Sequence, residues 1–532
     1  MKLRFKNEKI YIASIIVGVI SGIICVAFRY CIAQVTSLRP KLFNHSNSLT
    51  THIGVFCTIY AALFITRLLI DKFPKISGSG LPQTQALMFG RRVYNKPLMY
   101  LVVKFFGGVF SLCSGLSLGR EGTSVQMGSL TGYITGNILN TKEGQKRHLI
   151  AAGAGAGVSA AFTAPLSSSI LIMESLQKVT LSTTIICTLL AGTIAGIISK
   201  LITPFNIYQT IPVATPQIPL TTLLPFYLAM SIFFALFGKM FSKMLLKGKE
   251  IYAKWKTYLA KRGRTRALIT EVLLLSTTTW IMGLFFTDMI GGDQTFLVKE
   301  SVINSFLATD ILHNEIITKL LNMLILLGVT IIIWSFTILS HSSGFPGGIF
   351  LPMMTVGGLL GKLFYDITSF ICAQHLMETD LSGYFILLGM SAFFISVMRT
   401  PITGFILISE MTGHYETFFP TLIIGTLVYY FTQLARVEPL NNMLYNFMVA
   451  QDTEQPERTT IYLDIEPESY FNGRTINKLT LPADCTLKVL IRENKSIPIS
   501  STLKILKGDQ IGIEIKSKDI EKLYRSLISL GS

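Results

Sequence analysis

Charged residues are scarce in this chain of 532 residues: Asp, Glu, Lys and Arg make up 14% of it, against roughly 25% in soluble domains. Half of the residues are hydrophobic, and the mean hydropathy is +0.52. This composition excludes an ordinary soluble globular protein. About a dozen apolar runs are long enough to cross a bilayer, among them 10–32, 55–70, 98–118 and 268–290. We therefore expect an all-α, polytopic membrane protein embedded in a lipid bilayer.

Cysteine is also rare, and its spacing argues against two kinds of site. The seven cysteines show no C-x-x-C or Cys/His pattern of the kind that marks a metal site or a disulfide framework. Most of them lie in apolar segments, so we interpret them as small packing residues. We expect no metal site and no cofactor, and we do not expect an enzyme.

Acidic residues are too few to balance the basic ones, which leaves a formal net charge of +17. The excess lies beside apolar runs: in the segment before residue 10, and in the nine Lys or Arg residues from Lys243 to Arg266. Basic flanks of this kind stay on the cytoplasmic side, so topology explains the charge better than a nucleic-acid partner, which we do not expect. The first apolar run lacks a clear signal-peptidase site. We expect a multi-pass protein of a bacterial plasma membrane.

The composition changes near residue 450, where a polar, proline-interrupted segment begins. We interpret 1–450 as the membrane domain, 451–461 as a linker and 462–532 as a small α+β cytoplasmic domain. The last part contains strand-like apolar runs and one run with helical spacing, which are Ile461–Ile465, Thr486–Ile491, Ile511–Ile515 and Asp519–Ile528.

The membrane domain contains an internal repeat, with halves of roughly 50–240 and 268–450. Residues recur 229 or 236 positions later, which pairs Gly119 with Gly348, Gly128 with Gly357, Pro165 with Pro401 and Glu174 with Glu410. Duplicated halves with glycine-rich interruptions predict a transport site made by broken helices near the bilayer midplane. The offsets alone do not say whether the repeat is inverted.

Three glycine-rich segments are poor candidates for continuous helix: GSGLP (78–82), GREG (119–122) and GFPGGIFLP (344–352). A helix that begins inside a membrane presents free N–H groups, and such ends bind anions. The alternative is that the glycines only let helices pack closely; three such segments, two of them related by the repeat, favour the anion site. The expected donors are the backbone N–H groups of Gly122, Gly348, Ile349 and Phe350 and the hydroxyl of Ser79.

These segments resemble the three signature segments of the CLC family of chloride channels and proton-coupled chloride exchangers. The stretches AGVSAAFTAPLSSSILIME and MRTPITGFILISEMT are similar to the family as well. The resemblance implies a homodimer with one anion pathway per subunit, an inverted repeat of tilted and half-length helices, and cytoplasmic termini.

By position, Ser79 resembles the family's central serine and Glu121 its gating glutamate, the proton acceptor. A carboxylate that faces anion-binding amides competes with chloride, and protonation removes this competition. The simpler alternative is a pair between Glu121 and the neighbouring Arg120. Lys104 aligns with a family lysine that could raise the local positive potential, or its side chain could extend to the interface. We interpret Glu174 and Glu410 as structural helix-end residues.

Two positions depart from the family pattern. Ser175 stands where the exchangers usually carry a proton-delivering glutamate, so water, the adjacent Glu174 or an uncoupled channel mechanism would have to explain its loss. Asn441 stands where the family usually has a tyrosine hydroxyl near the central chloride. An amide can also donate to an anion, and Tyr445, one turn later, is a further candidate.

The tail resembles the TrkA-C (RCK C-terminal) module, which implies a dimerising regulatory domain with a small cytosolic ligand. We expect a Cl⁻/H⁺ antiporter gated by Glu121, with chloride and protons as the transported ions. The alternatives are a voltage-gated-type chloride channel, a fluoride exporter and a membrane receptor. Ser79 in its GSGLP context favours chloride over fluoride.

Overall fold

The computed structural model describes residues 2–515 except for 45–48, 178–181, 203–212, 215, 217–218, 286–314, 372–379, 452–458, 466–468, 480, 483 and 493–494. The expected helix at Asp519–Ile528 and the last residues of the apolar run 268–290 lie outside the described residues.

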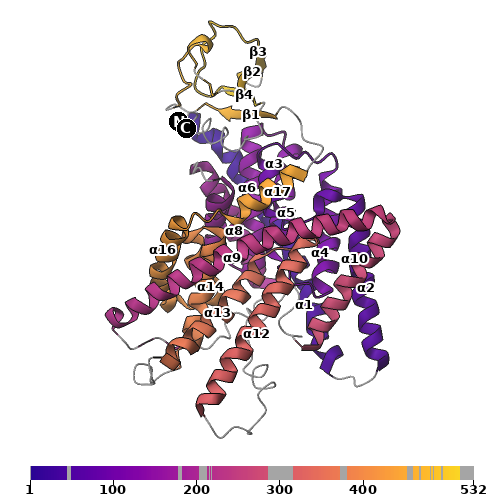
Figure 1. Ribbon diagram of the computed structural model, residues 1–532. Helices are drawn as coiled ribbons and strands as arrows, with labels where there is room; N and C mark the ends of the chain where they lie inside the picture. The colour runs from indigo at the N-terminus through magenta and orange to yellow at the C-terminus, as the bar shows by residue number, and fades with distance from the viewer. Residues whose placement is uncertain are drawn as a thin grey trace.

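The described membrane part is built of helices of very unequal length (Figure 1). They are α1 (Lys2–Asn44), α2 (Leu49–Lys72), α3 (Leu81–Met88), α4 (Pro97–Cys113), α5 (Glu121–Ile138), α6 (Glu143–Phe162), α7 (Pro165–Ile172), α8 (Ser182–Ile202), α9 (Leu220–Lys261), α10 (Arg264–Phe285), α12 (Glu315–Ser342), α13 (Phe350–Ile371), α14 (Ser382–Met398), α15 (Pro401–Thr412), α16 (Phe418–Leu434) and α17 (Leu440–Gln451). A π-helical turn, η2 (Met173–Gln177), follows α7.

Among the described residues, seven helices are long and apolar enough to cross a membrane. The described residues form fewer spanning helices than the sequence has long apolar runs, because several of these runs do not form one continuous helix. The run 98–118 ends its helix at Cys113, and α3 and α7 are only eight residues long. Proline stands at the first or second position of α3, α4, α7 and α15, where its missing N–H costs nothing.

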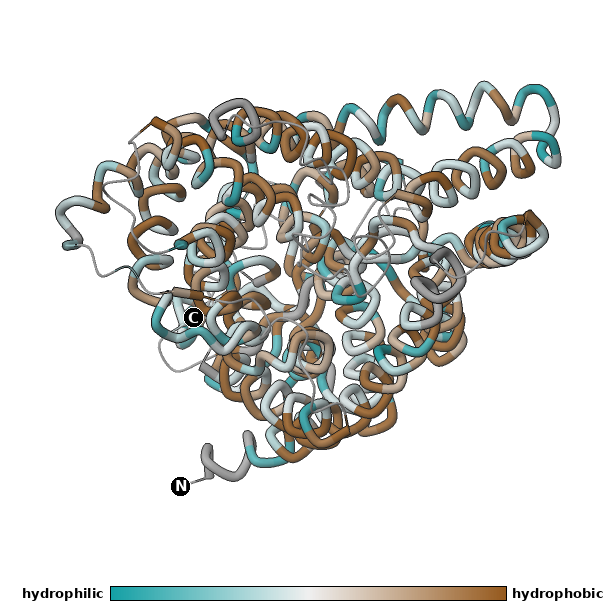
Figure 2. Tube along the Cα trace, turned by 90° about the horizontal axis from the view of Figure 1, so that it is seen from below, coloured by the Kyte–Doolittle hydropathy of each residue, from teal (hydrophilic) through white to brown (hydrophobic). Residues whose placement is uncertain are grey.

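Large apolar side chains cover the outside of the helical part. Ile12, Leu98 and Leu324 expose 59%, 64% and 64% of their surfaces. Exposing this much apolar surface costs free energy in water but not in lipid. Seen along the perpendicular direction, hydrophobic residues follow most of the outer helices (Figure 2). The chain is a multi-pass membrane protein, as the sequence predicts.

A pair of equivalent glycines joins the two halves. The Gly119 N–H donates to the Gly348 carbonyl at 2.8 Å, and the Gly348 N–H returns the bond at 2.5 Å, which makes an isolated antiparallel bridge. Equivalent residues that pair antiparallel run in opposite directions and are related by a local two-fold axis. This two-fold relation is the one that an inverted repeat requires.

Helix packing repeats this symmetry. In the first half, a Cβ added at Gly128 would overlap the carbonyl oxygen of Gly153, so α5 and α6 touch backbone to backbone. In the second half, a Cβ at Gly357 would lie 2.7 Å from the Gly389 carbonyl oxygen, which brings α13 and α14 together in the same way. Close approach of this kind requires small residues.

The C-terminal domain is a four-stranded antiparallel sheet, shown in yellow beyond α3 and α17 in Figure 1. Its order is β1-β4-β2-β3, from β1 (Thr459–Asp464), β2 (Cys485–Arg492), β3 (Lys495–Ile497) and β4 (Gln510–Ile515). The three expected strands are present, and β3 was missed because it is only three residues long. Its buried side chains, among them Leu463 and Ile511, form one cluster with Phe89 and Tyr445 of the membrane domain.

Candidate functional site

Three helices begin at one point inside the membrane domain: α3, α5 and α13. A Cβ added at Gly80 would overlap the carbonyl oxygen of Gly122, and one added at Gly122 would lie 2.8 Å from the Cα of Gly348. Each glycine-rich segment interrupts a helix as predicted. In two of them, Gly78, Gly80 and Gly344 have positive φ angles of 88°, 93° and 77°, which disfavour other residues. The free N–H groups of three helix starts therefore converge.

Glu121 lies at this point and is fully buried. Its Oε1 accepts a hydrogen bond from the Phe350 N–H, which belongs to the other half of the repeat, at 2.7 Å. The N–H of Leu351 also faces this carboxylate. The carboxylate thus takes donors that an anion would use, which favours the gating interpretation over a simple pair with Arg120. Leu351 was not among the predicted donors, although a helix N-terminus offers more than one free N–H.

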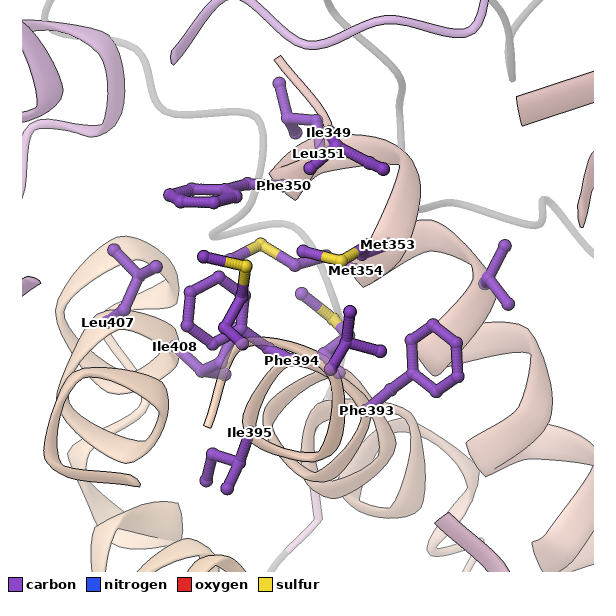
Figure 3. Close-up of a cluster of buried hydrophobic side chains, with 14 of the residues drawn as sticks. Ile349, Phe350, Leu351, Met353, Met354, Phe393, Phe394, Ile395, Leu407 and Ile408 are labelled. Carbon is purple, nitrogen blue, oxygen red and sulfur yellow. The ribbon is translucent and has the colours of Figure 1, made fainter. Parts of the chain in front are cut away.

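An apolar cluster fixes the start of α13. The rings of Phe350 and Phe394 meet edge to face, with centroids 5.1 Å apart, and Leu407 and Ile408 lie on the same side (Figure 3). Phe350 is 1% exposed. The packed ring holds the Phe350 N–H toward Glu121 without any charged residue on α13 near the donor.

The expectation for Gly348 is wrong in this structure. Its N–H donates to the Gly119 carbonyl and is not open to an anion. Gly348 instead makes room for Glu121 because it has no side chain: a Cβ at either Gly119 or Gly348 would overlap the Glu121 carboxylate. For Ile349 and Gly122, the structure places the backbone beside Glu121, and their donor roles stay predictions.

Ser79 lies on the wall of a cavity of about 690 Å³. Residues of α17 and of the basic C-terminal part of α9 line the cavity, and the Lys and Arg residues there place it on the cytoplasmic side. Lys104 is fully buried behind Ser79 and donates to the carbonyls of Ile76 at 2.7 Å and Gly78 at 3.1 Å. Lys104 therefore does not reach the interface; its Nζ binds the backbone of the turn that carries Ser79.

Asn441 does not face an open anion site, which corrects that expectation. Its Nδ2 donates to Gln85 Oε1 at 2.9 Å and to the Ser175 carbonyl at 3.4 Å. All three residues are buried. Gln85 Nε2, Ser175 Oγ and Asn441 Oδ1 have no hydrogen-bond partner among the described residues. Buried polar atoms of this kind usually bind ordered water. Gln85 was missed, although it lies one turn into the helix that follows GSGLP.

Tyr445 also differs from its expected place. Its ring meets that of Phe89 edge to face, with centroids 6.2 Å apart, within the cluster that joins α3, α17 and the C-terminal domain. This contact does not support the compensating role near the anion, which stays a prediction. Asn441 and Tyr445 lie on the same face of α17, but the turn that carries Tyr445 packs against the C-terminal domain.

Glu174 accepts hydrogen bonds at the start of α15, in the other half of the repeat. Its Oε2 accepts from the N–H of Thr403 at 2.9 Å and from the hydroxyl of the same residue at 2.6 Å. Glu410 accepts from the N–H and hydroxyl of Ser167 at 2.9 and 2.6 Å. Each carboxylate thus caps the helix that begins in the other half, which favours the structural interpretation of both residues.

Comparison with known proteins agrees with this geometry. The family described as voltage gated chloride channel matches residues 61–433, and the TrkA-C domain matches residues 461–528. The H(+)/Cl(-) exchange transporter ClcA of Vibrio cholerae is 28% identical over 463 residues, which cover 84% of this chain and 91% of that protein. The protein of the same name from Vibrio campbellii is 28% identical over 441 residues, which cover 82% and 89%.

Solved structures share the fold. A slow cyanobacterial Cl-/H+ antiporter superposes with a TM-score of 0.71 at 23% identity, covering 84% of this chain and 99% of that one. A CLC-type fluoride/proton antiporter gives a TM-score of 0.57 at 20% identity, covering 81% and 96%. The family match extends over most of the chain and includes every residue of the converging helix starts, so this protein belongs to the voltage gated chloride channel family, the CLC family.

Proposed function

We propose that this protein exchanges chloride for protons across a bacterial plasma membrane. The observation that carries the proposal is the hydrogen bond from the Phe350 N–H to the Glu121 carboxylate. A single group that competes with an anion when charged, and releases its donors when protonated, links the movement of the two ions. The names of the ClcA relatives from Vibrio support this function over that of a channel.

The exchange cycle follows from the charge state of Glu121. With Glu121 ionised, its carboxylate holds the donors of α13, and chloride is excluded from them. Protonation removes the negative charge and weakens the bond, because hydrogen bonds to charged groups are about twice as strong as neutral ones. The side chain leaves, chloride takes the freed N–H groups of Phe350 and Leu351, and the helix N-terminus stabilises it. Chloride then moves to the hydroxyl of Ser79 and the cavity beyond it.

The proton needs an inner route, since position 175 carries a serine. We place this route at Gln85, Ser175 and Asn441, whose unpartnered buried atoms would hold water between the cytoplasm and the anion path. Ser175 lies in the π-helical turn η2, a distortion that is frequent at functional sites. Water held by these residues relays protons without a carboxylate, so the serine does not require a channel mechanism.

Proton movement driven by a chloride gradient tests the proposal. The purified protein is placed in lightly buffered liposomes, and uphill proton movement is recorded with Glu121→Gln as the control. We expect uphill movement in the wild type and none in the variant, with chloride flux retained in both. Chloride flux without proton movement in the wild type would establish a channel, and the same assay with fluoride in place of chloride tests the fluoride exporter. A protein without anion flux would be a receptor.

We also propose a homodimer, and a regulatory role for the TrkA-C domain with a small cytosolic ligand. The family resemblance supports the dimer. Leu166 on α7 and its repeat equivalent Ile402 on α15 are 48% and 46% exposed, so the two halves offer matching apolar surfaces to a second copy. A subunit count in nanodiscs that gave a monomer would contradict this proposal.

A further inference from the structure

The cytoplasmic cavity contains polar groups that the exchange cycle does not use. His341, at the end of α12, lines it and is 3% exposed, and both of its ring nitrogens lack a hydrogen-bond partner among the described residues. The hydroxyl of Ser342 is also without a partner there. Leaving such groups unsatisfied costs free energy, so an imidazole and a hydroxyl without partners on one cavity wall indicate a ligand.

A lysine side chain lies beside these groups. Lys249 of α9 lines the same cavity, and its Nζ donates to the His341 carbonyl at 3.0 Å. A Cβ added at Gly248 would lie 3.0 Å from Ser342 Oγ, so the hydroxyl is next to the backbone that carries Lys249. No carboxylate of the described residues forms an ion pair with Lys249. Its charge is therefore open to an anion.

The acidic groups of the cavity are already engaged. Five Lys or Arg residues and one Asp line it. That residue, Asp71, pairs with Arg67 at 2.8 Å, and Arg67 also binds the buried Glu271 at 3.0 Å. The remaining four basic residues leave the cavity positive, and low-dielectric walls focus such a field onto small anions.

The wall with His341 connects directly to the Ser79 turn. Gly344, three residues after His341, accepts hydrogen bonds at its carbonyl from the Gly78 N–H at 3.0 Å and from the Ser77 hydroxyl at 2.6 Å. An anion held at the end of α12 is thus on the approach to Ser79, although it touches neither Ser79 nor the helix starts at Glu121.

We propose that Lys249, His341 and Ser342 form a loading site for a small monovalent anion at the cytoplasmic entrance. The ammonium group of Lys249 supplies the charge, and the imidazole N–H and the Ser342 hydroxyl complete the donors. The site raises the local concentration of the transported anion before it reaches Ser79. This inference rests on the proposed anion transport.

Bromide, a halide with an anomalous X-ray signal, tests the site in crystals of the full chain. We expect a bromide peak within hydrogen-bond distance of His341 and Ser342 in the wild type and in Lys247→Met, which removes an exposed charge from the same helix outside the cavity. Lys249→Met should lose this peak and keep any peak at the Ser79 turn. A wild type with no bromide between these residues would overturn the proposal.

Transport gives a second readout. With chloride varied on the cytoplasmic side of a planar bilayer, Lys249→Met should raise the half-saturating concentration about threefold or more and leave the maximal rate within about twofold. An unchanged half-saturation would overturn the loading role. If Lys249→Met does not fold, Ser342→Ala keeps the Lys249 bond to α12 and must show the same loss of bromide. If bromide binds between Lys249, His341 and Ser342 but the protein shows no chloride flux, the proposed function is refuted while the anion-binding site is confirmed.

Discussion

The Oε1 atom of Glu121 lies 2.7 Å from the backbone nitrogen of Phe350, a residue 229 positions later in the chain. This hydrogen bond joins residues from the two halves of the repeat. In the proposed exchange cycle it closes the anion path and makes that path sensitive to protons, because only the ionised carboxylate competes strongly for the donor.

Chloride flux should depend on pH through Glu121. Lower pH favours the protonated, released side chain, so wild-type flux should rise as pH falls, by up to about tenfold per pH unit for a one-proton step. Glu121→Gln carries no titrating group here, and its flux should change little over the same range. A pH dependence that persists unchanged in the variant would assign the gate to another group.

Glu174 and Glu410 should behave as equivalent caps. Each carboxylate accepts hydrogen bonds from two backbone N–H groups and one hydroxyl group. Replacing it with alanine leaves these three donors without their acceptor, so Glu174→Ala and Glu410→Ala should each destabilise the protein by about 2 kcal/mol. Thermal unfolding in detergent measures this change. The ratio of protons to chloride should stay that of the wild type; a selective loss of proton movement in Glu174→Ala would return that residue to the proton path.

Gly122 should tolerate no side chain. A Cβ there would overlap the carbonyl oxygen of Ser79, and backbone cannot move aside as a flexible side chain can. Gly122→Ala should therefore abolish anion binding or folding. Gly328→Ala is the matched control, because a Cβ at this helical glycine meets nothing within 4 Å; it should be neutral or stabilising by about 0.5–1 kcal/mol. Similar yields and fluxes for the two variants would contradict the close approach of α3 and α5.

The inner polar cluster should control proton movement more than chloride movement. Gln85→Met keeps the length of the side chain and removes its polar atoms, so proton flux should fall about tenfold or more if water there relays protons. Asn442→Leu, at the neighbouring position on α17, is the control. Ser175→Glu should raise proton flux by restoring a carboxylate. Equal losses of both ions in Gln85→Met would indicate a structural role only.

Stability of the C-terminal domain should depend on one ion pair. Asp509 is 1% exposed and accepts from Arg492 Nε at 2.7 Å and from the Leu506 N–H at 2.8 Å. Asp509→Asn should destabilise the domain by about 3 kcal/mol, since it removes the buried carboxylate that forms the ion pair with Arg492. Lys488→Met, which breaks an exposed pair with Glu514 at 3.7 Å, should cost under about 1 kcal/mol. Hydrogen exchange of the sheet in the full chain measures both changes.

The local chemistry of the chain predicted much of this architecture. Low charge and long apolar runs are sufficient for a membrane protein, and glycine and proline mark where a helix cannot continue, because their effects on φ and on backbone N–H groups need no partner. Glu121 was identifiable for the same reason: an isolated carboxylate within a glycine-rich break inside a span is costly without a function.

The partners of these residues were decided only by the tertiary structure. The inversion of the repeat became visible in the Gly119–Gly348 bridge, the Gly348 N–H turned out to be occupied, and Asn441 met Gln85 across 356 residues of chain. Composition and spacing describe what each residue offers. Which donor meets which acceptor depends on how distant helices pack, and that packing is a property of the whole chain.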